Sequence, residues 1–328
     1  MSTNNTELFI QARIIAEHRE RYALSCEFGE IYGRLKTKEY FEGEQPFPTT
    51  GDYVLIDYNP SGDSRIVETL PRKTFFSRRN PTPGRGEQLV AANFDYVFIM
   101  QSLNMDFNPK RLERYLTLAW QSGATPIIIL TKADLVEDIS SHLASVSMVA
   151  PGVEVFAVSA KTGDGLSQLS PYLSAGKTIV FLGSSGIGKS SLVNALAGKE
   201  IMAVNGIRED DSKGRHTTPH RQLITLDCGA MIIDTPGMRE LGMWDVTVGL
   251  GEAFSDVEQF LGCCKFSDCK HQSEPGCAIK AALASWRSYQ NLDREAKFSE
   301  SKSSYLRQKQ ERNKNISKWS KQMKSTKR

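Results

Sequence analysis

The chain has 328 residues, 40% of them hydrophobic and 24% charged, which is ordinary for a globular protein of two or three domains that can bury a core. A formal net charge of +3 does not by itself point to nucleic acid or to any other partner. The longest apolar runs are far too short to cross a bilayer and the polar start carries no export signal, so we expect a cytoplasmic protein without a membrane span.

Residues 1–79 alternate short β-like runs with turns. The runs read ALSCEFGEIYGRLK, GDYVLIDY and SRIVETL, and turn signals lie at Gly51 with Asp52 and at residues 60–63. The pattern contains no long amphipathic helix. It predicts a small all-β barrel.

A linker rich in Pro and Gly, NPTPGRGE, covers residues 80–87, and the pattern then changes to alternating strands and helices. This alternation predicts a doubly wound α/β sheet. Such sheets bind ligands at the carboxyl ends of their strands, where each motif below lies. The predicted strands cover residues 96–100, 126–130, 153–158, 178–182, 222–226 and 231–233, and the predicted helices 109–122 and 189–197.

The stretch GSSGIGKS matches the phosphate-binding loop G-x-x-x-x-G-K-[ST], and it has the required strand before it and helix after it. Its backbone N–H groups would surround the phosphates, Lys189 would reach the β- and γ-phosphates, and the Ser190 hydroxyl would ligate magnesium. The alternative is a chance match. The predicted phosphate-binding residues are Gly183, Ser184, Ser185, Gly186, Ile187, Gly188, Lys189, Ser190 and Ser191.

The tetrapeptide DTPG follows a later apolar strand. Asp234 would hold magnesium through water, and the N–H of Gly237 would meet the γ-phosphate. A D-x-x-G motif is weak alone and gains its value from the phosphate loop upstream.

A base-reading motif, TKAD, consists of Thr131, Lys132, Ala133 and Asp134. The carboxylate of Asp134 can accept hydrogen bonds from guanine N1–H and its exocyclic amine, a donor pair that adenine lacks. The alternative is an ordinary loop with a capping Asp. A second loop of the kind that closes on guanine, SAK, follows another strand and consists of Ser159, Ala160 and Lys161.

These motifs form a complete GTPase set in a rotated order, because an ordinary GTPase has the phosphate loop before the base reader. A parallel sheet tolerates circular permutation when the old ends are joined and new ends open in a loop. The sequence therefore predicts a circularly permuted P-loop GTPase domain over residues 80–243, cut just after DTPG.

Between the phosphate loop and DTPG lies the polar stretch KGRHTT, residues 213–218. Thr217 or Thr218 would complete the magnesium shell when the γ-phosphate is present. The alternative is a plain exposed loop.

Four of the six cysteines fall between Cys263 and Cys277, in a region that turns helical after Trp244. With no export signal, clustered Cys with a His favours metal over disulfides. Three thiolates and one imidazole make a closed tetrahedral site, so the sequence predicts one structural zinc; free or buried thiols are the alternative. The predicted ligands are Cys264, Cys269, His271 and Cys277.

The tail over residues 301–328 carries ten Lys or Arg and one acid, Glu311. It is either a solvated end or a basic arm that neutralises phosphates, and barrels of the predicted size often bind oligonucleotides.

The rotated motifs, the barrel and the phrase CKFSDCKHQSEPGCAI resemble the small-ribosomal-subunit-dependent GTPases of bacteria, the RsgA/YjeQ family. The resemblance covers nearly the whole chain. It implies a multi-domain α/β protein with an RNA-binding OB-fold barrel over residues 1–79, the permuted GTPase domain, and a helical zinc-finger-like domain over residues 244–300. It also implies late maturation of the small (30S) ribosomal subunit, with GTP hydrolysis stimulated by that subunit and its rRNA as partner.

Met238 follows DTPG, where Ras-like GTPases place a water-orienting Gln nearby. A thioether cannot position water, so His216 is the candidate catalytic group, with Thr217 and Thr218 beside it. The leading prediction is thus a monomeric GTPase that uses GTP with Mg²⁺ and releases GDP. Two alternatives are a GTP-binding RNA adaptor with little turnover and an ATP-dependent RNA-processing enzyme.

Overall fold

The computed structural model describes residues 9–35, 40, 47–79, 87–104, 107–202, 221–234, 247–261, 263–266, 269–271, 274–282 and 285–299. They belong to two compact units, one with Met1–Phe76 and Leu89–Glu240, the other with Ser77–Gln88 and Leu241–Arg328. Within the described ranges, no helix combines the length and apolar character that a membrane span needs.

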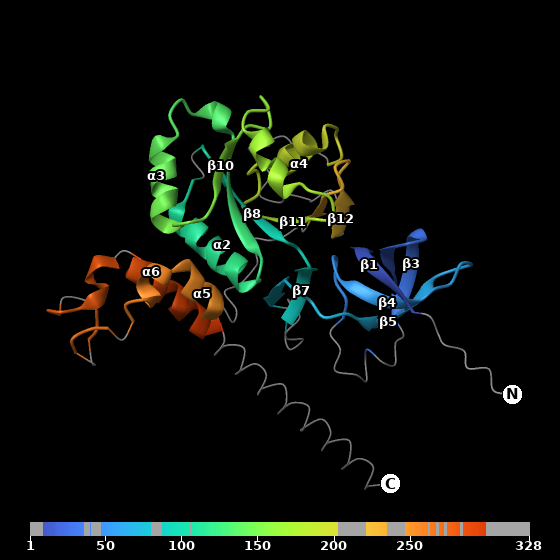
Figure 1. The fold of residues 1–328 in the computed structure, drawn as a ribbon, viewed down its shortest axis with the longest axis horizontal. Helices are drawn as coiled ribbons and strands as arrows, with labels where there is room; N and C mark the ends of the chain where they lie inside the picture. The colour runs from blue at the N-terminus through green and yellow to red at the C-terminus, as the bar shows by residue number, and fades with distance from the viewer. Residues whose placement is uncertain are drawn as a thin grey trace, which may run out of the picture. The chain divides into compact units, whose positions relative to one another are not determined.

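The N-terminal strands close into a five-stranded barrel, which confirms the prediction (Figure 1). Each strand pairs with two neighbours around the ring, antiparallel except for the parallel pair β3–β5. Alternate residues point inward, and Ile14, Leu24, Val54, Ile56 and Ile66 form a fully buried core. The strands are β1 (Ile10–Glu17), β2 (Tyr22–Cys26), β3 (Gly29–Leu35), β4 (Tyr53–Asp57) and β5 (Ser64–Thr69).

The α/β part holds the predicted sheet, in the order β10-β9-β8-β11-β13-β12. All its neighbouring pairs are parallel except β12–β13, so five strands end at the same edge. A further ribbon pairs β6 (Phe75–Arg79) with β7 (Glu87–Ala92). The strands of the sheet are β8 (Tyr96–Ser102), β9 (Thr125–Thr131), β10 (Val155–Val158), β11 (Thr178–Leu182), β12 (Gln222–Thr225) and β13 (Met231–Asp234).

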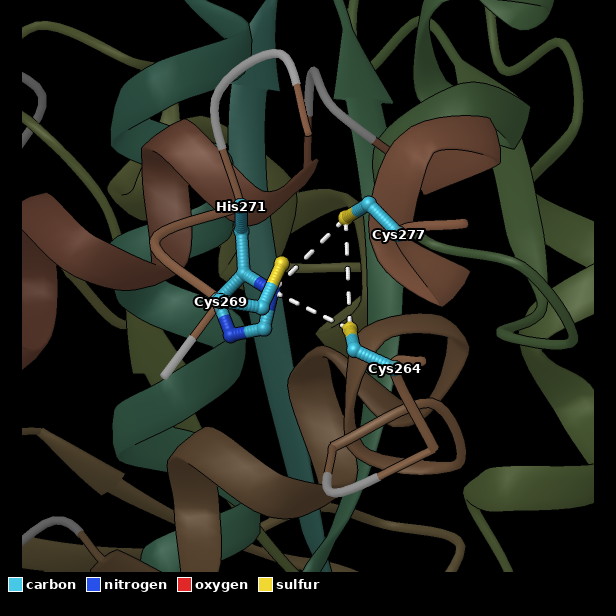
Figure 2. Close-up of side chains that lie close together, drawn as sticks. All are labelled: Cys264, Cys269, His271 and Cys277. Carbon is cyan, nitrogen blue, oxygen red and sulfur yellow. Dashed lines mark hydrogen bonds between the residues drawn. The ribbon is translucent and has the colours of Figure 1, made fainter. Parts of the chain in front are cut away.

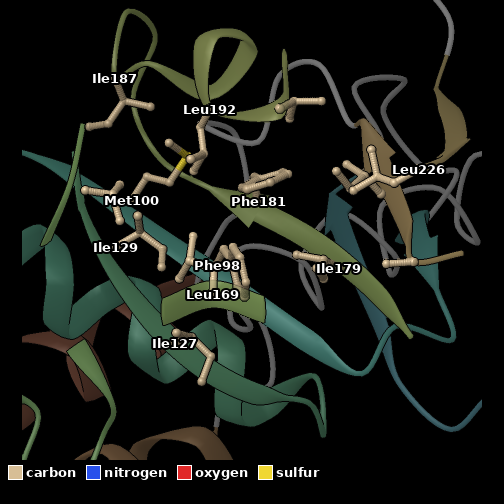
Figure 3. Packing of buried hydrophobic residues seen from close by; sticks show 14 residues of the cluster. Phe98, Met100, Ile127, Ile129, Leu169, Ile179, Phe181, Ile187, Leu192 and Leu226 are labelled. Carbon is tan, nitrogen blue, oxygen red and sulfur yellow. The ribbon is translucent and has the colours of Figure 1, made fainter. Parts of the chain in front are cut away.

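Helices and short 3₁₀ turns connect these strands: α2 (Pro109–Gln121), η1 (Ala133–Leu135), α3 (Ser140–Val149), η2 (Leu166–Tyr172) and α4 (Lys189–Ala197). The start of α2 shows why it forms where it does. The side chain of Asn108 accepts a hydrogen bond from the N–H of Arg111, and Pro109 takes the first helical position, where no N–H is needed. On the face of the sheet towards α4, Phe98, Ile129 and Phe181 belong to one buried cluster (Figure 3).

One strand that the sequence patterns did not predict, β1, belongs to both sheets. Residues 10–13 pair with β4 and close the barrel, and Ala16 pairs with Gln222 of β12. The barrel and the α/β sheet therefore form one continuous hydrogen-bonded sheet of 11 strands.

The second unit includes helices among its described residues after Trp244, as predicted for this region, with turns around the cysteines. It contains α5 (Thr247–Ala253), α6 (Ser255–Glu258), η4 (Ala278–Ala282) and a helix over residues 285–299. A row of aromatic contacts joins these elements: Phe254 meets Tyr289 edge to face, and Tyr289 stacks on Trp286. Phe254 is buried, together with Leu250, Val257 and Ile279.

Candidate nucleotide site and metal cluster

The predicted motifs meet at one edge of the parallel sheet. The phosphate loop follows β11, the base reader follows β9, SAK follows β10 and Asp234 ends β13. Because neighbouring strands are parallel and in register, these segments lie side by side in space, although they follow one another in the sequence in a rotated order.

Glycines shape the phosphate loop between β11 and α4. A side chain on Gly183 would come within 3.2 Å of the Cβ of Met100, so the chain passes β8 closely only without one. Gly186 and Gly188 adopt φ of 74° and 102°, which other residues rarely adopt. The loop then enters α4 at Lys189, so the N–H groups of the first turn lie at the site and can face an anion.

Lys189 and Asp234 form an ion pair across this edge, the lysine ammonium donating to the carboxylate. One residue comes from the start of α4 and the other from the end of β13. A cation suited to phosphate and a carboxylate suited to a divalent metal thus lie in contact.

Two residues of the base reader bind the phosphate loop directly. The hydroxyl of Thr131 lies 2.7 Å from the carbonyl of Ile187 and 3.3 Å from that of Gln101, so its single proton is shared between the phosphate loop and the end of β8. Lys132, in the left-handed region with φ of 59°, donates from Nζ to the carbonyl of Gly186 at 3.0 Å. The base reader and the phosphate loop therefore form one connected structure.

Asp134 is exposed, and the second loop orients its carboxylate. The hydroxyl of the fully buried Ser159 donates to Oδ1 of Asp134 at 2.7 Å, and the same oxygen of Ser159 accepts from the N–H groups of Lys161 and Thr162 at 3.2 Å. A carboxylate has about four acceptor positions. Asp134 can therefore still accept two more hydrogen bonds, from two donors on one edge of a ligand. The direct contact between the two loops was not foreseen from the sequence.

Several predicted residues lie outside the described residues: His216, Thr217, Thr218, Gly237 and the basic tail of residues 301–328. Most of the predicted linker, residues 80–86, also lies outside them.

The second unit brings all four predicted metal ligands together. The sulfurs of Cys264, Cys269 and Cys277 and a ring nitrogen of His271 lie within 4.8 Å of one another (Figure 2). Nδ1 of His271 is 3.3 Å from Sγ of Cys264 and 3.7 Å from Sγ of Cys277, and these two sulfurs are 4.0 Å apart. Tetrahedral zinc, with Zn–S of about 2.3 Å and Zn–N of about 2.0 Å, places its ligand atoms roughly 3.5–3.8 Å apart, so the cluster fits this metal.

The turns around the cluster orient its ligands. His271 has φ of 57°, and its ring meets Trp286 edge to face at 4.7 Å. Cys263, next in sequence to a ligand, is exposed, and its sulfur faces backbone carbonyls instead of the cluster.

The pKa values of the thiols also favour a bound cation. Burial acts to raise the pKa of Cys264, but the N–H of Ala278, 3.3 Å from its sulfur, and the neighbouring thiols outweigh burial and lower it. The N–H of His271 acts to lower the pKa of Cys269, but burial and the two other cluster thiols raise it to about 11. Because one thiolate hinders ionisation of the next, Cys264 and Cys269 ionise together near neutral pH only when a cation takes up their charge.

The sequence is similar to that of a known family of GTPases. The profile of one family, described as RsgA GTPase, matches residues 69–244. The chain is 48% identical over 308 residues to small ribosomal subunit biogenesis GTPase RsgA 1 of Listeria monocytogenes, covering 92% of this chain and 87% of that protein. It is 44% identical to RsgA 2 of Lactiplantibacillus plantarum, covering 88% and 84%.

Solved structures agree with the sequence relatives. The crystal structure of YjeQ from Thermotoga maritima superposes with a TM-score of 0.65 at 26% identity, covering 87% of this chain and 97% of that one. YloQ, described as a circularly permuted GTPase, has a similar fold with a TM-score of 0.61 at 24% identity, covering 91% and 99%.

Proposed function

Because the chain belongs to the RsgA GTPase family and is a GTPase, we propose that it acts as a late checkpoint in assembly of the small ribosomal subunit. In this role it binds rRNA in the cytoplasm as a monomer, and the subunit stimulates its GTP hydrolysis. The printed names of its relatives support the biogenesis role, since they are small ribosomal subunit biogenesis GTPases.

The observation that carries the nucleotide assignment is the connection between the two halves of the site. Lys132 spans from the base reader to Gly186, and Ser159 orients Asp134. Guanine then lies against the exposed carboxylate of Asp134 while the phosphates lie at Lys189 and the start of α4. The proposed GTP-binding residues are residues 131–134, 159–161 and 183–191 together with Asp234 and Gly237.

Magnesium is the metal that GTP hydrolysis requires, and Ser190, Asp234 and the threonines at 217 and 218 are its proposed ligands, direct or through water. The proposed catalytic group is His216. The Cys₃His cluster holds one structural zinc, in which His271 binds through Nδ1, the ring nitrogen that faces two of the sulfurs.

The barrel surface supports an RNA-binding role for residues 1–79. Phe28 is 56% exposed and stacks on Tyr58 at 4.6 Å, and the guanidinium of Arg21 lies 3.7 Å over the ring of the exposed Tyr32. Exposed aromatic faces with stacked arginine suit unpaired bases. The basic tail of residues 301–328 would add phosphate contacts.

Multiple-turnover hydrolysis of GTP, measured with and without purified small ribosomal subunits, tests this proposal. The expected result is turnover that rises when subunits are added and is weak with ATP. Binding of GTP and RNA without turnover, with or without subunits, would favour the adaptor. ATP turnover equal to that of GTP would favour the ATP-dependent enzyme.

A further inference from the structure

The barrel is hydrogen-bonded to the GTPase sheet close to the edge where the proposed nucleotide site lies. Ala16 of β1 pairs with Gln222 of β12, and Gln222 pairs on its other side with Asp234 of β13. Three strands, one from the barrel and two from the GTPase sheet, thus carry these residues in one row. The proposed metal-binding carboxylate stands two strands away from the barrel.

Glu17, the residue after Ala16, makes further contacts between the barrel and the start of β12. Its Oε1 accepts hydrogen bonds from the hydroxyl of Thr49 at 2.6 Å and from the N–H of Thr50 at 3.0 Å. The same oxygen lies 3.6 Å from Nη1 of Arg221, whose side chain is only 12% exposed. Charges in such a half-buried setting are screened less than surface pairs, so this contact restrains Arg221.

Arg221 is the residue immediately before β12, and it has further restraints. Its Nη1 donates to the carbonyl of Leu89 at 2.9 Å, and its own carbonyl lies 3.4 Å from the hydroxyl of Thr50. Glu17 and Thr50 of the barrel therefore fix both the side chain and the backbone at the beginning of β12.

The other end of β1 is bound to the far end of the same sheet. The guanidinium of Arg13, 7% exposed, donates to Thr178 of β11 at 2.9 Å and to the carbonyl of Asn93 at 2.8 Å, and contacts the sulfur of Met231. Thr178 and Met231 begin β11 and β13, at the edge of the sheet away from the nucleotide site. Of the two ends of these contacts along β1, the Glu17 end lies beside the row that contains Asp234.

The turn that carries Thr50 also packs against β13. A side chain on Gly51, which has φ of 95°, would come within 2.1 Å of the carbonyl of Ala92 and 2.9 Å of Cδ1 of Ile233, the neighbour of Asp234. The close approach leaves little room for β13 to shift without the barrel.

We propose that Glu17 is a positioning residue for GTP hydrolysis: by holding Arg221 it fixes the start of β12, and through the Gln222–Asp234 pairing it fixes the carboxylate that serves magnesium. This inference rests on the proposed role of Asp234. Loss of the anchor frees the start of β12, so the carboxylate of Asp234 samples orientations that do not suit metal binding. Positioning effects through one packed strand are on the order of 2- to 30-fold in the affected constant.

The test is GTP hydrolysis by the full chain as a function of Mg²⁺ concentration, for wild type, Glu17→Ala and Glu17→Gln. Glu17→Ala should raise the Mg²⁺ concentration at half-maximal rate by about 2- to 30-fold and lower the maximal rate. Glu17→Gln keeps the oxygen that Thr49 and Thr50 need, so it should recover part of the loss. GDP affinity measured in EDTA should not fall below the wild-type value, because the base and phosphate contacts are untouched and a freed Asp234 competes less for Lys189.

Three further variants make the test decisive. Arg221→Ala should shift the Mg²⁺ profile in the same direction. The double variant Glu17→Ala, Arg221→Ala should shift it by less than the product of the two single shifts, because both single variants remove the Glu17–Arg221 contact. Glu30→Ala, an exposed acid of the barrel, is the matched control and should leave the Mg²⁺ profile unchanged.

Glu17→Ala with the wild-type Mg²⁺ profile would overturn the inference. So would a rate that falls equally at all Mg²⁺ concentrations in step with the fraction of chains that bind nucleotide, since that marks a purely structural role. Failure of the proposed nucleotide site gives a different result: Asp234→Asn would then hydrolyse GTP at the wild-type rate.

Discussion

The ammonium of Lys189 donates a hydrogen bond to the carboxylate of Asp234, so two groups with separate tasks in the proposed site neutralise each other. Their side chains are 29% and 17% exposed, and a pair with this degree of exposure contributes about 0.2–1 kcal/mol. Nucleotide must separate the pair before Lys189 reaches phosphate. The contact therefore opposes nucleotide binding until magnesium takes over Asp234.

Asp234→Asn should consequently act in opposite directions on binding and on hydrolysis. Without magnesium, GDP affinity should rise, by up to about fivefold, because Lys189 loses its competitor. With magnesium, GTP hydrolysis should fall on the order of tenfold or more, because the metal loses a carboxylate. Fluorescent-GDP titration in EDTA and steady-state hydrolysis measure the two effects. Asp227→Asn, which breaks the exposed pair with Lys199, should change neither, and a drop in metal-free affinity of Asp234→Asn would refute the competition.

Asp134→Asn should change the base preference of the site from guanine to xanthine. The carboxylate accepts two charge-assisted hydrogen bonds from guanine in the proposed complex, and losing them costs roughly 2–5 kcal/mol. An amide can donate to the extra carbonyl of xanthine, so affinity for xanthosine triphosphate should rise as that for GTP falls. Competition binding with both nucleotides measures the exchange. Asp138→Asn, four residues on and capping the N–H of Ser140, should keep the wild-type preference; unchanged GTP affinity in Asp134→Asn would mean that another group reads the base.

Local patterns predicted the nucleotide-binding elements closely. β11 and α4 have the predicted bounds, because an apolar strand, a glycine loop and a helix follow one another without long-range help. β8 and β9 run one or two residues beyond their predicted ends, to Ser102 and Thr131. These polar ends are buried and paired with each other across the sheet, so the strands continue after the apolar pattern has stopped.

The attachment of the barrel could not be predicted in this way. β1 carries Arg13 and Glu17, and charged residues weaken a strand pattern. Their partners are distant in sequence, with Thr178 lying 165 positions from Arg13. Only tertiary packing brings such groups together, so β1 and its role in both sheets follow from the structure alone.

Thr131→Val should weaken nucleotide binding without leaving a cavity around residue 131. Valine has nearly the same shape, but it cannot donate to the carbonyl of Ile187 and leaves a buried acceptor unpaired, at a cost of about 1–3 kcal/mol. The phosphate loop should lose order, and GDP affinity should fall by roughly tenfold. Thr131→Ser keeps the hydroxyl and should bind as wild type. Equal GDP affinities for the Val and Ser variants would show that this bond does not support the loop.

The metal cluster gives a prediction that does not depend on nucleotide. The protein should purify with about one zinc per chain by elemental analysis, and Cys269→Ser or His271→Ala should lose it, because removing one ligand opens the closed tetrahedral site and weakens metal binding. Cys263→Ser is the matched control: its sulfur faces carbonyls outside the cluster, so this variant should keep the metal. Metal-free wild-type protein would exclude the zinc assignment.

Removal of zinc should also be visible in Trp286, whose ring meets His271 at 4.7 Å and stacks on Tyr289 at 5.6 Å. Metal binding and local folding are linked, so a chelator should release His271 and loosen the aromatic row of the second unit. Tryptophan emission should therefore change with the same time course as zinc release, and Trp286→Phe should abolish this part of the signal. GDP affinity should stay constant through the change, because the nucleotide site lies in the other unit. If zinc leaves with no change in emission, the cluster does not organise the helices around it.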